Sequence, residues 1–177
     1  MSGLMHDRGF FGRKTRSFTL QWHLTNRCGF NCHHCYDRSA HAELELSAAL
    51  KVAADLKNFC RRHRVQPQAS LSGGDPFLYP HFWGVYDALV FAGVRVSILD
   101  NPISSADLQR LLSYRAPSYF QVSLEGLREH NDDIRGRGHF DHTMEFLKRA
   151  RHIGLETHVM LTLTRANLDQ VIPLGTA

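Results

Sequence analysis

The chain has 177 residues, of which 43% are hydrophobic and 21% are charged, and its formal net charge is +4 at pH 7. This length and composition are those of one ordinary globular domain with its own core. No apolar run approaches the roughly 18 residues that a membrane span needs, and no apolar signal-peptide segment opens the chain, so we expect a cytoplasmic protein with no membrane partner. The basic residues form no stripe interleaved with aromatic residues, so nucleic-acid binding is not indicated.

Along the chain, segments with the composition of strands alternate with segments whose apolar residues have helical spacing. Residues 1–17 mix glycine with arginine and lysine, which predicts a mobile basic arm. The predicted strands span 18–25, 68–72, 94–99, 119–124 and 157–164. The predicted helices begin at or next to Ser47, Pro80, Ser104 or Ser105, Phe140 and Asn167. This alternation predicts an α/β fold with a parallel sheet and right-handed crossovers.

The residues with chemical character fall on loops that follow the predicted strands. Three cysteines follow the first strand, Gly73-Gly74-Asp75 follows the second, and Asn101 follows the third. Ser123 and Glu125 end the fourth strand, and Arg135 lies in the long connection after it. Because the working residues of parallel sheets gather at the carboxyl ends of the strands, we expect these groups on one rim of the fold.

The three thiols of the first loop are Cys28, Cys32 and Cys35. A four-iron cluster needs one terminal ligand per iron, so three thiolates hold three irons and leave the fourth open to a ligand that is not protein. An open metal position is typical of catalytic sites. The spacing leaves two alternatives open, which are a zinc site completed by His33 or His34, and unconnected thiols. Cys60 lies among apolar residues of a predicted helix and is interpreted as a small buried hydrophobic residue.

Taken in order, these motifs resemble those of the radical S-adenosylmethionine (radical SAM) enzymes. The cysteine loop corresponds to the family's Cys-x3-Cys-x2-Cys motif, Gly73-Gly74-Asp75-Pro76 to its glycine-glycine-acid motif, and Ser123-Leu124-Glu125 to its ribose-binding motif. Arg135 corresponds to a basic residue that follows in many members. The chain departs from the family at His34, which stands before the third cysteine where an aromatic residue is usual, with Tyr36 just beyond that cysteine.

The resemblance implies a parallel partial (β/α) barrel of the radical SAM type. The family's barrel has six strand–helix units and five are predicted here, so the core over residues 18–177 would stop before the sixth strand. We therefore expect an N-terminal part of a larger protein, which by itself would be unstable, oligomeric, or slow or inactive in turnover. Many peptide-modifying members also carry a C-terminal domain with further iron–sulfur clusters, for which this chain has no cysteines.

The resemblance also implies how a 4Fe-4S cluster and S-adenosylmethionine would be held. The methionine part would chelate the open iron, with Gly73 and Gly74 allowing close backbone approach and Asp75 orienting that loop or assisting the ammonium group. The alternative for Asp75 is an acid that starts a helix before Pro76. Asn101 is a further candidate contact, although Asn-Pro is also an ordinary turn.

The remaining implied contacts have alternatives of their own. Glu125 would accept two vicinal ribose hydroxyls with Ser123 nearby, and its alternative is a strand residue that faces solvent. Arg135 would pair with the ligand carboxylate or form a surface salt bridge. Tyr36 would lie against the adenine or belong to the core. No residue of the chain is nominated as a catalytic acid or base.

The reaction implied by the resemblance is reductive cleavage of S-adenosylmethionine, followed by removal of a substrate hydrogen atom by the 5′-deoxyadenosyl radical. The motif phrases look most like those of peptide maturases, including maturases of small cysteine- or selenocysteine-rich peptides, so the expected substrate is a ribosomally made peptide. An electron donor such as flavodoxin or ferredoxin is implied. The competing function is a non-enzymatic zinc module that uses the three cysteines and a histidine to bind a partner protein or RNA.

Overall fold

The computed structural model describes residues 16–36, 39 and 41–176. The predicted basic arm over 1–17 lies outside these residues except at its last two positions, and Ser17 already begins a strand. Within the described part of the chain, no helix combines the length and the apolar character needed to cross a bilayer.

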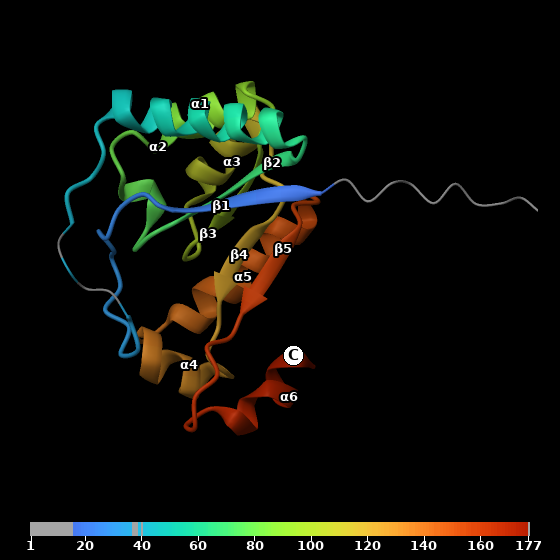
Figure 1. Ribbon diagram of the computed structural model, residues 1–177. Helices are drawn as coiled ribbons and strands as arrows, with labels where there is room; N and C mark the ends of the chain where they lie inside the picture. Colours follow the sequence, from blue (N-terminus) through green and yellow to red (C-terminus); the bar gives the residue numbers. More distant parts are fainter. Residues whose placement is uncertain (1–15, 37–38, 40, 177) are drawn as a thin grey trace, which may run out of the picture.

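Five parallel strands form one open sheet, in which each strand pairs with its neighbours in the sequence (Figure 1). The strands are β1 (Ser17–His23), β2 (Gln66–Ser72), β3 (Arg95–Leu99), β4 (Phe120–Ser123) and β5 (Thr157–Met160). The sheet order β1-β2-β3-β4-β5 leaves β1 and β5 at the two edges. This arrangement confirms the predicted α/β class with five strand–helix units, because only crossover helices connect sequential parallel strands.

Six helices connect or follow the strands in the described residues, together with 3-10 turns at Pro76–Leu78 and Leu168–Gln170. The helices are α1 (Leu46–His63), α2 (Phe82–Phe91), α3 (Ser105–Tyr114), α4 (Arg128–Arg135), α5 (His139–His152) and α6 (Val171–Gly175). Ser104 caps α3 as predicted, since its hydroxyl accepts from the Asp107 N–H. The other predicted helix starts are one to a few residues off, because Glu45 precedes α1 and α2 begins only at Phe82.

Helix α4 lies in the long connection after the fourth strand, for which the sequence analysis proposed no helix. Its residues are almost all polar, and it buries only Asn131, so it lacks the apolar stripe from which helices are recognised. Tertiary hydrogen bonds stabilise this segment instead. The Asn131 side chain accepts from the Glu125 N–H and donates to His139, and the Asp132 carboxylate accepts from the N–H groups of Gly138 and Phe140.

The two faces of the sheet differ in chemistry. The face toward the helices is apolar, and rings from strands and helices meet there, as Phe120 does with Phe146 at a centroid distance of 4.9 Å. On the opposite face the strand register places polar side chains beside one another. Ser70 and Ser97 share a hydrogen bond of 2.8 Å, and Gln121 lies beside His158. The opposite face therefore presents hydroxyl, amide and imidazole groups next to the carboxyl rim.

The fifth strand is shorter than predicted, because residues 161–164 leave the sheet. The Thr162 N–H donates to the Glu125 carboxylate rather than to a strand. Asn167, predicted to cap a helix, makes no side-chain cap. Its amide instead donates to the carbonyls of Glu125 and Thr162 and accepts from the N–H of Thr164. This segment is thus tied to the end of β4 rather than extended beside it.

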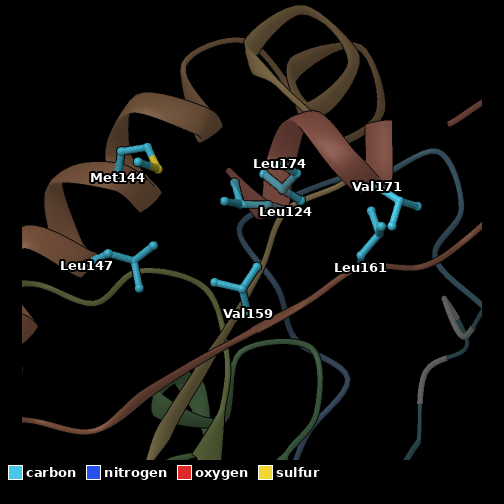
Figure 2. Close-up of a pocket in the computed structure, with 8 residues that line it drawn as sticks. Leu124, Met144, Leu147, Val159, Leu161, Val171 and Leu174 are labelled. Atoms are coloured by element: carbon cyan, nitrogen blue, oxygen red, sulfur yellow. The ribbon is translucent and has the colours of Figure 1, made fainter. Parts of the chain in front are cut away.

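An apolar groove of about 350 Å³ runs along the open edge of β5 (Figure 2). Figure 2 shows Met144 and Leu147 of α5, Val159 of β5 and Leu174 of α6 directed into it. Val159 is about half exposed. The labelled side chains are all apolar, so the groove suits an apolar group better than a charged cofactor.

Candidate functional site

The cysteine loop leaves β1 and is held in place by the loop after β2. The N–H groups of Gly74 and Asp75 donate to the carbonyls of Thr25 and Arg27 at 2.8 and 2.7 Å. A Cβ on Gly73 would stand 2.3 Å from the Thr25 carbonyl oxygen, and Gly73 has a φ of +154° that side chains disfavour. The glycine pair was expected to allow close approach of a ligand, and the structure shows that it allows close approach of the cysteine loop itself.

The far side of the cysteine loop contacts α4. Figure 1 shows the loop after β1 running toward this helix, and the His33 N–H donates to the Ile134 carbonyl at 2.9 Å. The loop is therefore fixed at both ends, by the strand rim on one side and by α4 on the other.

Two of the loop sulfurs receive N–H donors from other elements. Cys28 Sγ accepts from the Phe30 N–H at 3.4 Å and from Asn101 Nδ2 at 3.9 Å, and Cys32 Sγ accepts from Arg135 Nη1 at 3.9 Å. Burial raises the pKa of both thiols, while the Arg135 guanidinium opposes the rise in the pKa of Cys32. N–H donors aimed at sulfur stabilise thiolates, which are the ligands that an iron–sulfur cluster requires.

Glu125 is the centre of a buried ion-pair network. Its side chain is fully buried, and Oε1 accepts from Arg135 Nε and Nη2 at 2.8 and 2.6 Å and from His34 Nε2 at 2.9 Å. Oε2 accepts from the Thr162 N–H at 3.0 Å. The Arg135 side chain is 11% exposed, so the pair is not a surface salt bridge, and Glu125 does not face solvent. The network joins the end of β4 to α4 and to the cysteine loop.

Asp75 and Asp100 form a pair of neighbouring carboxyl groups at the rim. The Asp75 carboxylate accepts from the Phe77 N–H, so the helix-starting role considered as an alternative is present. Asp100 was not singled out from the sequence, although it directly precedes Asn101 at the end of β3. Burial, followed by the neighbouring Asp75, raises the pKa of Asp100 well above its ordinary value. Because a nearby positive charge would stabilise the ionised forms of these two carboxyl groups, a cation would be favoured beside them.

Three buried polar atoms at the rim have no hydrogen-bond partner among the described residues. They are His34 Nδ1, Ser72 Oγ and Asp100 Oδ2. Buried polar groups in folded proteins are nearly always paired, so three orphans at one edge indicate a site built for a polar ligand. Together with three thiols on one loop, this donor set fits a cluster with S-adenosylmethionine beside it.

Tyr36 and Ser123, two further residues predicted to contact S-adenosylmethionine, lie next to the third cysteine and at the end of β4. Tyr36 is 82% exposed, so it is not a core residue, and its hydroxyl is 2.8 Å from His23 Nε2. Ser123 is half-buried at the end of β4, beside Met160 in the strand register. Cys60 is buried within α1, as the sequence indicated.

The zinc alternative gains no support from the described residues, in which no three His, Cys, Asp or Glu side chains are grouped so that they could hold a single metal ion.

The sequence matches the radical SAM superfamily over residues 22–174. Fe-coproporphyrin III synthase of Methanosarcina barkeri is 26% identical over 164 residues, which cover 89% of this chain and 40% of that protein. The mycofactocin maturase MftC of Mycolicibacterium smegmatis is 28% identical over 86% of this chain and 39% of its own length. The chain thus spans about 40% of the length of these relatives.

Among solved structures, Streptococcus suis SuiB is similar in fold. Its structure bound to S-adenosylmethionine has a TM-score of 0.72 and 18% identity, covering 92% of this chain and 38% of SuiB. SuiB bound to its precursor peptide SuiA has a TM-score of 0.71.

Proposed function

The chain belongs to the radical SAM superfamily. On this premise we propose that residues 18–177 form the radical SAM core of an enzyme that modifies a ribosomally made peptide. The observation that carries the proposal is the cysteine loop, whose sulfurs accept N–H donors from Asn101 and Arg135 on the rim that holds the glycine pair and Glu125. A zinc module would need only the three cysteines and a histidine, and would not require the cysteine loop to lie beside Asn101, Arg135 and Glu125.

The residues proposed to hold the cluster are Cys28, Cys32 and Cys35, one iron each. When bound, the cluster would supply the electron for reductive cleavage of S-adenosylmethionine, the source of the radical chemistry on the substrate. The chain's own share is to bind the cofactors, to orient them and to exclude water. The segment at 162–167 supports this share, because it closes one side of the rim through Glu125 and Asn167.

The methionine part of the cofactor is proposed to lie over the loops after β2 and β3. Asp75 and Asp100 would face its ammonium group, because a buried carboxyl pair is stabilised by a cation. The backbone at Gly73 and Gly74 would border the same site. Asn101 would lie between this site and Cys28, to which its amide already donates.

The nucleoside part is proposed to lie along the end of β4. Glu125 is fully buried and its Oε2 accepts the Thr162 N–H, so it would accept a ribose hydroxyl only after this side of the site opens, with Ser123 two residues before it. Tyr36 would border the adenine after leaving its contact with His23. Arg135 would approach the ligand carboxylate only by giving up part of its pairing with Glu125.

A peptide substrate is supported by two findings. The relatives include a maturase, and the fold is similar to that of SuiB, whose structure holds a precursor peptide. The polar face of the sheet next to the rim also suits a chain of amides, because Gln121 and His158 can exchange hydrogen bonds with peptide groups. We further propose a cytoplasmic location and an electron donor such as flavodoxin or ferredoxin.

Anaerobic reconstitution tests the proposal. The protein should take up iron and sulfide, turn brown, and bind S-adenosylmethionine with a change in the EPR signal of the reduced cluster. Bound zinc with a flat visible spectrum after the same treatment would mean that the proposal is wrong.

A further inference from the structure

We propose that Arg135 and Asn101 raise the reduction potential of the cluster by donating N–H groups to the sulfurs of Cys32 and Cys28. The inference deepens the proposed function and rests on it. It gives both residues a role toward the cluster itself, in addition to any contact with S-adenosylmethionine.

The two donors come from different parts of the fold and reach different sulfurs. Asn101 follows β3 and is nine-tenths buried, and its Nδ2 lies 3.9 Å from Cys28 Sγ. Arg135 ends α4, and its Nη1 lies 3.9 Å from Cys32 Sγ. Both contacts are within the longer range of hydrogen bonds to sulfur, and both donors have little exposure to solvent that would compete for them.

The guanidinium group of Arg135 has a fixed orientation. Its Nε and Nη2 donate to Oε1 of Glu125, which leaves Nη1 directed at Cys32. Glu125 is fixed in turn by the Thr162 N–H on its other oxygen, while its own N–H donates to Asn131. Rotating the guanidinium away from Cys32 would disturb a fully buried carboxylate, so the cation stays beside the sulfur.

The direction of the effect follows from charge. Reduction adds one negative charge to the cluster and its thiolates, and a cation or N–H dipole near sulfur stabilises the reduced form more than the oxidised form. The interaction is weakly screened because both donors are largely buried. The Glu125 carboxylate offsets part of the Arg135 charge, but Arg135 acts more strongly on Cys32 than Glu125 does. Asn101 offers only a dipole, so Arg135 should have the larger effect.

The test is an EPR-monitored redox titration of the reconstituted chain without S-adenosylmethionine. Arg135→Gln should shift the potential to more negative values, Arg135→Lys should shift it less, and Asn101→Leu should give a smaller negative shift than Arg135→Gln. Arg128→Gln is the matched control, because Arg128 begins the same helix, is about half exposed and pairs with Asp141. Its potential should equal that of the wild type.

The outcomes separate this inference from the proposed function. If the wild-type chain forms no iron–sulfur cluster, the proposed function fails. If clusters form with wild-type iron content but Arg135→Gln and Asn101→Leu keep the wild-type potential, only this inference is overturned. A variant that binds S-adenosylmethionine less tightly at unchanged potential also counts against it. Should Arg135→Gln fail to fold, the milder Asn101→Leu and Arg135→Lys decide between these results.

Discussion

Adding one methyl group at Gly74 should detach the cysteine loop from the rim. A Cβ built there lies 2.4 Å from the carbonyl oxygen of Arg27 and 2.8 Å from that of Asn26, and both are backbone atoms. To bring this Cβ to an ordinary contact distance of 3.4 Å, the cysteine loop and the loop after β2 must move apart by roughly 1 Å. This movement breaks the hydrogen bonds from Gly74 and Asp75 to the cysteine loop. Forced overpacking costs about 1–3 kcal/mol and each lost hydrogen bond about 1 kcal/mol. With two such hydrogen bonds lost, Gly74→Ala should lower the free energy of unfolding by about 3–5 kcal/mol.

The matched control is Gly29→Ala, on the same loop, where a Cβ would meet nothing within 4 Å. Urea unfolding of the cluster-free protein under reducing conditions, followed by circular dichroism, measures both variants. For a domain of this size each kcal/mol corresponds to roughly 2–4 °C in Tm, which gives a second reading. Gly74→Ala should also retain less iron after reconstitution. Equal stability and equal iron in the two variants would refute the idea that the glycine pair positions the loop.

Three further predictions concern the site. Replacing any one loop cysteine by alanine should abolish the cluster, measured as iron and sulfide per chain, whereas Cys60→Ala should leave it; the reverse result would overturn the ligand assignment. Glu125→Gln should keep the cluster but weaken S-adenosylmethionine binding by about 1–2 kcal/mol, seen by titrating the EPR signal, and an unchanged affinity would make Glu125 purely structural. Burial lowers the pKa of His139 to about 4, so its unfolded form binds a proton at a higher pH than its folded form. Stability should accordingly fall by up to about 3 kcal/mol as the pH drops from about 6.5 to 4. His139→Gln should lose this part of the pH slope, and the exposed His142→Gln should retain it; equal slopes in both variants would contradict the assignment.

The sequence alone was sufficient to predict the layout of the fold and the rim. Apolar strand segments alternating with helical patterns predict a parallel sheet. Each pattern is a spacing of apolar residues within one short segment, so it can be recognised from the sequence alone. The cysteine spacing and the glycine pair could be recognised for the same reason, since each is a short stretch of chain. Their placement on strand ends then followed from the topology of parallel sheets.

Only the tertiary structure decided which side chains meet. Helix α4 has no apolar stripe, so its existence depends on hydrogen bonds to residues outside it. The pairing of Glu125 with Arg135 and His34 joins residues that are 10 and 91 positions away in the sequence, and Asp100 is unusual only because of its burial beside Asp75. Such pairings leave no periodic signal in the sequence, because they are set by the distance between loops after folding. The sequence therefore determined where the candidate site is expected, and packing determined how the side chains there are arranged.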